Sequence, residues 1–369
     1  MTEGRWAGGL ESRGGTHAEP VQRYPRSGIR DPGVGVRVWG LRIRRKGAMK
    51  GPVTTIVVVS VCVLATIHTS AQDNVRRTPW GDPDIEGIWT NATLTPLQRP
   101  PELASKEFFT AEEAKQFQQT RLEQTNADRP LPPGQVGAYN DAFFERGTSI
   151  VRSRRTSLVI DPPDGRVPAL TPDAQRRVEA RQQREKTSPA DGPEDRWLTE
   201  RCILFGATVP MLPEPYNNNY RIIQSPGFVT ILVEMNHDAR VIPLDNRPHL
   251  GAAIQQWTGD SRGHWDGNTL VVETANLKFN HQSRFGVGYL NGLSDDRLRV
   301  VERFAVVDAN TLTYRATVED STVFVRPWTV ELSMDRTAGP LYEVACHEGN
   351  YGMANILSGH RAEEREPRP

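Results

Sequence analysis

Two short segments of the sequence concentrate side chains that can exchange protons or hold a ligand. The segment EMNHDARVIPLDNRPH, residues 234–249, contains two histidines among carboxylates and arginines, and the segment CHEGNYGM, residues 346–353, adds a third histidine. Imidazole and carboxylate groups are common general acids and bases because their pKa values can be tuned toward neutral pH. We predict His237 and His347 as candidate catalytic residues, and Arg240 and Asn350 as candidate ligand-binding residues.

The same histidines could also be combined into a mononuclear metal site. His237, His249 and His347 with one carboxylate would supply enough ligands, but no spacing matches an HExxH motif or a Cys-x-x-Cys cluster. The chain also lacks a phosphate-binding loop and a dinucleotide fingerprint. The sequence therefore predicts no metal and no cofactor.

Glu302 is a third candidate because it lies on the apolar face of a predicted strand. In RLRVVERFAVV, residues 297–307, it alternates with leucine, valine and phenylalanine. An ionised carboxylate in such surroundings costs several kcal/mol unless it has a partner. One interpretation is an ion pair inside a barrel, with an arginine such as Arg240 or Arg326. The other is a catalytic acid or base at the floor of a ligand pocket, with a raised pKa.

The strands beside Glu302 carry aromatic residues on the same predicted face. Phe304, Tyr314 and Trp328 alternate inward with aliphatic neighbours, and we predict that they line the ligand cavity. In this interpretation the substitution Glu302→Gln leaves folding intact but weakens ligand binding or turnover.

The segment GDSRGHWDGNTLVVETANL, residues 259–277, reads as a β-hairpin. If Asp266 and Gly267 form a two-residue turn, Trp265 falls on the core face and His264 and Arg262 fall on the opposite one. Those two side chains then face solvent or the N-terminal segment. The alternative makes His264 a further ligand-binding residue.

The N-terminal part of the chain predicts export. Residues 49–71 have a lysine, an apolar run and small residues in the order of a cleaved signal peptide, and residues 1–48 are expected to be a non-native upstream extension. The apolar run is shorter than the roughly 20 residues that span a bilayer. Arg44 and Arg45 could instead belong to a twin-arginine signal. We predict a periplasmic or secreted protein with no stable membrane anchor after cleavage.

The charge and the cysteine content of the exported chain indicate which partners and which cross-links to expect. Residues 72–369 carry 34 Lys and Arg against 41 Asp and Glu, which argues against a nucleic-acid partner. Only Cys202 and Cys346 remain in this part of the chain. In an oxidising compartment such a pair predicts a disulfide, although a nucleophilic thiol or a metal ligand is the alternative.

The order of elements predicts a mainly β fold. Residues 72–198 form an irregular wrap with helices at about 110–124 and from Thr171 to about 186, the first with a capping box at Thr110 to Glu113. Residues 199–369 form an antiparallel meander that closes as a barrel. Its predicted strands are 219–225, 228–235, 239–243, 255–265, 269–276, 297–307, 311–319, 327–335 and 341–347.

Several sequence blocks resemble a widespread group of uncharacterised exported bacterial proteins. They include PWGDPDIEGIWTNATLTPLQRP, GAYNDAFFERG, RRTSLVIDPPDGRVP, PYNNNYRIIQSPGFVTILVEMNHDARVIPLD, GDSRGHWDGNTLVVET and YEVACHEGNYGM, and span about residues 79–364. The resemblance implies no activity and assigns no residue a role. The hairpin series is also similar in architecture to lipocalin-like (calycin) barrels.

Together these observations predict an exported barrel that binds a small, partly apolar molecule as a monomer or weak dimer. The first alternative is a cofactor-independent lyase, hydratase, isomerase or hydrolase that uses Glu302 with His237 or His347. The second is a structural envelope interaction module with a filled barrel.

Overall fold

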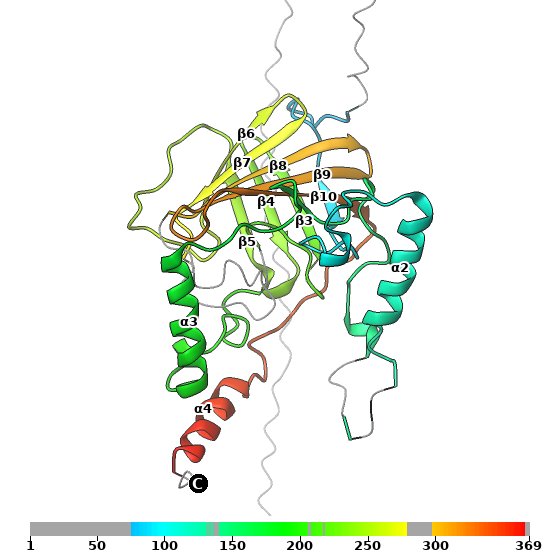
Figure 1. Cartoon of the computed structure of the whole chain (residues 1–369). Coiled ribbons are helices and arrows are strands. Elements are labelled where there is room, and N and C mark those ends of the chain that lie inside the picture. Colours follow the sequence, from blue (N-terminus) through cyan, green and yellow to red (C-terminus); the bar gives the residue numbers. More distant parts are fainter. Residues whose placement is uncertain are drawn as a thin grey trace, which may run out of the picture. The chain divides into compact units, whose positions relative to one another are not determined.

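The computed structural model describes residues 75–130, 132, 134–135, 140–205, 208–216, 218–278 and 297–365. The predicted upstream extension and signal peptide lie outside these residues. The described part is built on one antiparallel sheet (Figure 1) in the order β5-β4-β3-β1-β10-β9-β8-β7-β6, with β2 pairing with β10. The strands are β1 (Gly87–Thr90), β2 (Val159–Asp161), β3 (Asn219–Ser225), β4 (Phe228–Val233), β5 (Ala239–Pro243), β6 (Asp260–Asp266), β7 (Thr269–Ala275), β8 (Arg299–Asp308), β9 (Thr311–Glu319) and β10 (Trp328–Thr337).

The sheet curls until its two edge strands, β5 and β6, lie against each other. At Gly263 of β6 a Cβ atom would come within 2.8 Å of the side chains of Ile242 and Leu244. A larger residue at this position would require those side chains to move. The curled sheet is a nearly closed barrel, which confirms the predicted fold class.

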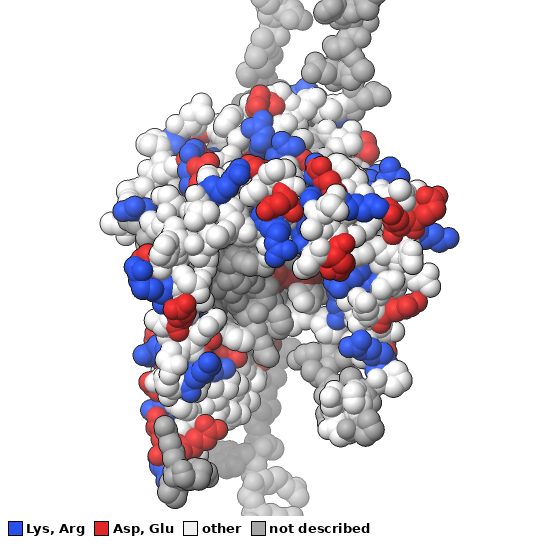
Figure 2. Space-filling model, in the orientation of Figure 1, with Lys and Arg blue, Asp and Glu red and all other residues white. Residues whose placement is uncertain are grey.

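Alternation of buried and outward-facing residues creates the core. Along β8, β9 and β10 every second residue is buried, and these residues join those of β3, β4 and β7 in one apolar cluster. The outer faces carry cross-strand ion pairs, such as Arg303 with Asp266 at 2.7 Å and Arg315 with Glu331. Basic and acidic residues are accordingly interspersed on the face shown in Figure 2.

The predicted meander is wrong at one end. Residues 341–347 form no strand, and β1 from the predicted wrap fills the place between β3 and β10. Two contacts hold the 341–347 segment elsewhere: the backbone N–H of Tyr342 donates to Glu234, and Cys346 is bonded to Cys202. The wrap thus supplies β1 and β2 to the sheet as well as helices.

The β6–β7 hairpin keeps its predicted faces but not its predicted turn. Asp266 pairs with Thr269, so that Gly267 and Asn268 form the turn. The pairing differs from the predicted one by two residues, and a shift of two preserves which side chains share a face. His264 is exposed and Trp265 packs against the core, as predicted.

Among the described residues three α-helices accompany the sheet: α2 (Ala111–Thr125), α3 (Pro172–Thr187) and α4 (Gly352–Glu363). The capping box predicted at the start of α2 is present, with the Thr110 hydroxyl accepting from Glu113 and the Glu113 carboxylate accepting from Thr110. The sequence did not predict α4. Short 3-10 helices are η1 (Pro101–Leu103), η2 (Asp141–Phe143), η3 (Pro193–Asp195) and η4 (Met235–His237).

The predicted disulfide is present between Cys202 and Cys346, with Cα atoms 5.7 Å apart. It joins the segment between η3 and β3 to the segment that follows β10. No helix among the described residues is long and apolar enough to span a membrane.

Candidate functional site

Glu302 lies in the barrel interior, where its side chain is completely buried. Its carboxylate accepts two hydrogen bonds from Arg240, at 2.6 and 3.2 Å, and one from the hydroxyl of Tyr314 at 2.8 Å. Arg240 belongs to β5 and Glu302 to β8, so the pair links two strands that are not neighbours in the sheet. The ion pair with Arg240 is one of the two arrangements that the sequence predicted.

Tyr314 extends this pair into a short chain of hydrogen bonds. Its hydroxyl donates to Glu302 and accepts from the backbone N–H of Met211 at 2.8 Å. Burial, together with the nearby Glu302 carboxylate, raises the pKa of the Tyr314 phenol well above its ordinary value. The phenol therefore stays protonated and fixes the carboxylate by donating to it.

The predicted cavity lining is packed in this structure. Phe304, Tyr314 and Trp328 have 0 % exposed surface, which leaves no water-sized space against them. The rings of Phe304 and Tyr314 lie 5.0 Å apart, and Trp328 makes an edge contact with Phe324. A ligand would reach these residues only if the interior opened, and their role in binding stays a prediction.

The two candidate catalytic histidines lie apart from this interior group, on a surface pocket of about 200 Å³. We call it the disulfide pocket. It is lined by Cys202, Asn236, His237, Glu343, Val344, Ala345, Cys346, His347 and Glu348. The structure thus brings His237 and His347 to one pocket, whereas Glu302 is engaged by Arg240 and Tyr314.

Three residues of the disulfide pocket have left-handed backbone conformations. Asn236, His237 and Cys202 have φ values of 59°, 54° and 54°. Such values are uncommon for residues other than glycine and persist where surrounding structure holds them. Two consecutive left-handed residues, Asn236 and His237, form the turn of η4 that carries the histidine to the pocket.

Asn236 also has the clearest sign of an unmet interaction. Both its side-chain nitrogen and its side-chain oxygen are buried and have no hydrogen-bond partner. A buried amide without a partner costs about 1–3 kcal/mol, so native proteins seldom leave one unsatisfied without a reason. Both atoms are shielded from solvent, so a bound molecule that donates and accepts hydrogen bonds would supply the missing partners once the Asn236 side chain turns toward the pocket.

Asp238 adds a perturbed carboxyl next to His237. Burial raises its pKa from 3.8 to about 6, against a smaller lowering effect of His237. The folded protein therefore binds a proton here between about pH 4 and 6, where the unfolded chain releases it. The contribution of this carboxyl to the free energy of unfolding therefore falls as the pH rises through that interval, and it stays low above pH 6.

Replacing Asp238 by asparagine should consequently stabilise the protein at pH 7 by about 1 kcal/mol, allowing for solvent screening of this partly exposed group. The gain should vanish below pH 4, where the aspartate is neutral in both states. Urea unfolding at pH 4 and pH 7 measures it. Asp245→Asn is the matched control, because Arg247 lowers the pKa of Asp245 to about 2 and no gain is expected there. An equal effect of Asp238→Asn at both pH values would refute the assignment.

The remaining predicted residues are distributed as follows. Asn350 borders the disulfide pocket, since its side-chain nitrogen lies 3.1 Å from Cys202 Sγ. His264 is exposed on the outer face of β6, and His249 is hydrogen-bonded to Asp260 at 2.9 Å. The metal arrangement of His237, His249 and His347 does not assemble among the described residues.

Sequence reasoning missed two features of the pocket. Asn236 precedes His237 in an Asn-His-Asp triplet, and asparagine is the residue most tolerant of left-handed backbone after glycine, which was an available signal. Nothing in the sequence indicates that Glu343 and Val344 complete the wall of the pocket.

Comparison of the chain with protein-family models and with curated proteins found no match.

Proposed function

We propose that this is an exported β-barrel protein that binds a small, partly apolar molecule in the disulfide pocket. The observation that carries the proposal is the Asn236 side chain, whose polar atoms are buried without partners at a pocket that also exposes His237 and His347. Ligand sites commonly combine an apolar lining with a few convergent polar groups. Here the disulfide, Val344 and Ala345 are the apolar part.

The charges of the lining suggest which molecule fits. Glu343 and Glu348 are acidic, the histidines can accept or donate, and no lysine or arginine belongs to the described lining. A neutral or cationic molecule that both donates and accepts hydrogen bonds is favoured over an anion. A volume of about 200 Å³ limits it to a small molecule.

Export is supported by two independent features. The sequence order of residues 49–71 predicts a signal peptide, and the intramolecular Cys202–Cys346 bond is typical of proteins that fold in an oxidising compartment. Mass measurement of the chain isolated from the periplasm should give a product that begins near residue 72. A chain that retains residues 49–71 would contradict the cleaved signal.

A second candidate, an envelope interaction module, is favoured by the packed interior and its Glu302–Arg240 pair. The notion of catalysis by Glu302 with either histidine finds less support, since the hydrogen bonds of Glu302 go to Arg240 and Tyr314. Binding of a small molecule in the disulfide pocket distinguishes the two proposed functions, because an interaction module does not need a small molecule there.

Native mass spectrometry of the chain purified from the periplasm tests the binding proposal. We expect an added small-molecule mass in the wild type that falls at least tenfold in occupancy in the His237→Ala/His347→Ala variant. His264→Ala is the matched control, because this histidine is exposed on the outer face of β6, and it should retain the added mass. An equal occupancy in both variants, or none in the wild type, would overturn the proposal.

A further inference from the structure

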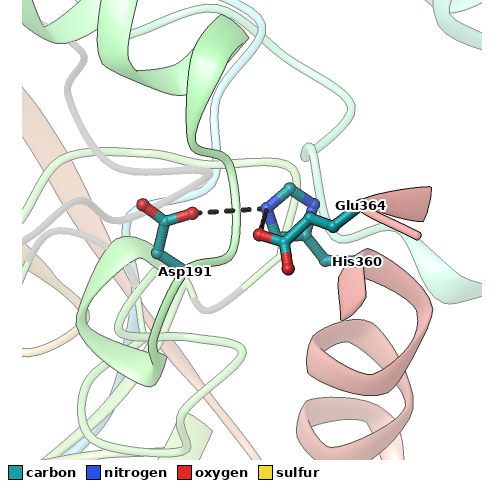
Figure 3. Close-up of side chains that lie close together, drawn as sticks. All are labelled: Asp191, His360 and Glu364. Carbon is teal, nitrogen blue, oxygen red and sulfur yellow. Dashed lines mark hydrogen bonds and ion pairs between the residues drawn. The ribbon is translucent and has the colours of Figure 1, made fainter. Parts of the chain in front are cut away.

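A second cluster of ligand-type side chains joins the C-terminal helix to a loop that is distant in sequence. His360 in the last turn of α4 and Glu364, the residue that caps its C-terminus, are four residues apart, so that both point to one side of the helix. Asp191 approaches from the loop between α3 and η3, as Figure 3 shows. Within the described chain this is the one set of three such groups whose ligand atoms all lie within 4.8 Å of one another.

Two of the three separations between ligand atoms in this cluster match those around a tetrahedral zinc ion. His360 Nε2 lies 3.3 Å from Asp191 Oδ1 and 3.6 Å from Glu364 Oε1. Zn–N and Zn–O bonds of about 2.0–2.2 Å at tetrahedral angles place two ligand atoms about 3.3–3.6 Å apart. Both separations fall inside this interval.

Hydrogen bonding explains the same arrangement less well. One imidazole nitrogen carries at most one proton, yet Nε2 faces two carboxylates, and both distances exceed the 2.7–2.9 Å typical of a charge-assisted hydrogen bond. The other ring nitrogen, Nδ1, lies 3.7 Å from Glu363 Oε2. With a metal ion on Nε2, the Nδ1–H would point toward Glu363, as the second ring nitrogen of a ligating histidine usually points toward an acceptor.

The charge balance also favours a divalent cation. Asp191, Glu363 and Glu364 contribute three carboxylates, and Arg361 contributes a guanidinium 3.3 Å from Glu364 and 3.9 Å from Asp191. Arg184 nearby is already paired with Asp195. With His360 neutral, these groups leave two negative charges that a divalent ion would balance, and Arg361 is the resident competitor for the same oxygens.

A cross-link here would have a structural use. The helix α4 has no fully buried residue, and its apolar packing is limited to the half-buried Met353, Ile356 and Leu357. Its described contacts with the 190–191 loop are the Asp191 contacts of His360 and Arg361 and a hydrogen bond from Arg361 to the carbonyl of Ala190. We propose that Asp191, His360 and Glu364 bind one zinc-class divalent ion, which fastens α4 to the loop after α3.

Isothermal titration of Zn²⁺ into the chelator-treated chain tests this proposal. We expect one ion per chain, bound at least tenfold more weakly by His360→Ala and by Glu364→Gln. Because Arg361 competes for the carboxylates, Arg361→Gln should bind several-fold more tightly. His264→Ala, with the same loss of an imidazole on the outer face of β6, should bind as the wild type does.

Hydrogen exchange of residues 352–363 supplies a readout of the cross-link itself. Zn²⁺ should slow exchange in α4 several-fold in the wild type and leave it unchanged in His360→Ala. Zinc binding that survives in His360→Ala but is lost in His237→Ala/His347→Ala would move the ion to the disulfide pocket and refute this site. Absence of binding would refute it too, and neither result bears on the small molecule proposed above.

Discussion

Replacing Glu302 by glutamine is expected to destabilise the protein by about 3–5 kcal/mol, the usual cost of breaking a buried ion pair from one side. The substitution would leave the Arg240 guanidinium, itself only 4 % exposed, without a negative partner in the barrel. This expectation reverses the sequence-based prediction that Glu302→Gln leaves folding intact. Urea unfolding monitored by tryptophan fluorescence measures it.

The double variant Glu302→Leu/Arg240→Met is the control for this result. Removing both charges leaves no unpaired ion, and apolar replacements of buried pairs are often neutral or stabilising. The double variant should therefore be more stable than Glu302→Gln, although Tyr314 loses its acceptor. If Glu302→Gln unfolds like the wild type, the pair does not hold the barrel together.

Removing the disulfide is expected to have an effect of similar size. The Cys202–Cys346 bond closes a loop with a sequence separation of 144 residues, and constraint of the unfolded chain on this scale is worth about 4–5 kcal/mol in the entropy model. Cys202→Ser/Cys346→Ser should lower the unfolding free energy by up to this amount. The same variant should lose the small molecule, because the bond forms part of the pocket wall.

Reduction separates the two consequences. Wild-type protein treated with a reducing agent should behave as the double serine variant in both unfolding and occupancy, while the variant itself should not respond to reduction. A variant as stable as the wild type would show that the two segments are held together by other contacts, such as the hydrogen bond from Tyr342 to Glu234.

The strands could be predicted because their side chains alternate strongly. From β3 to β10 the apolar positions repeat every second residue, and this period fixes both the existence of a strand and its inward face. It also placed Glu302 inside. The hairpin turn at Gly267 and Asn268 was missed by one position, because Asp-Gly and Gly-Asn are both good turn pairs.

The elements that were not predicted depend on contacts between distant residues. β1 has four residues, too few for periodicity, and becomes a strand because β3 and β10 leave room for it. The segment 341–347 has strand-like composition, but Cys346 is bonded to Cys202 and that bond draws the segment away from the sheet. The helix α4 has no fully buried residue, and its apolar face is limited to the half-buried Met353, Ile356 and Leu357.

The candidate site, like the fold, was predicted only in part. Residue types identified His237 and His347 as reactive groups, and inward alternation identified Glu302, but which of them meet is decided by the path of the chain after β10. The unpartnered amide of Asn236 becomes visible only when its surroundings are known. The sequence therefore predicts which residues are functional candidates more readily than it predicts which of them are in contact.

A crystal structure of the chain purified from the periplasm tests the central claim most directly. We expect electron density for a small molecule beside Asn236, His237 and His347. The Glu302–Arg240 pair should be intact, and the interior around Phe304 and Trp328 should be filled by protein alone. Ligand density between those interior aromatic residues, with the disulfide pocket empty, would contradict the claim.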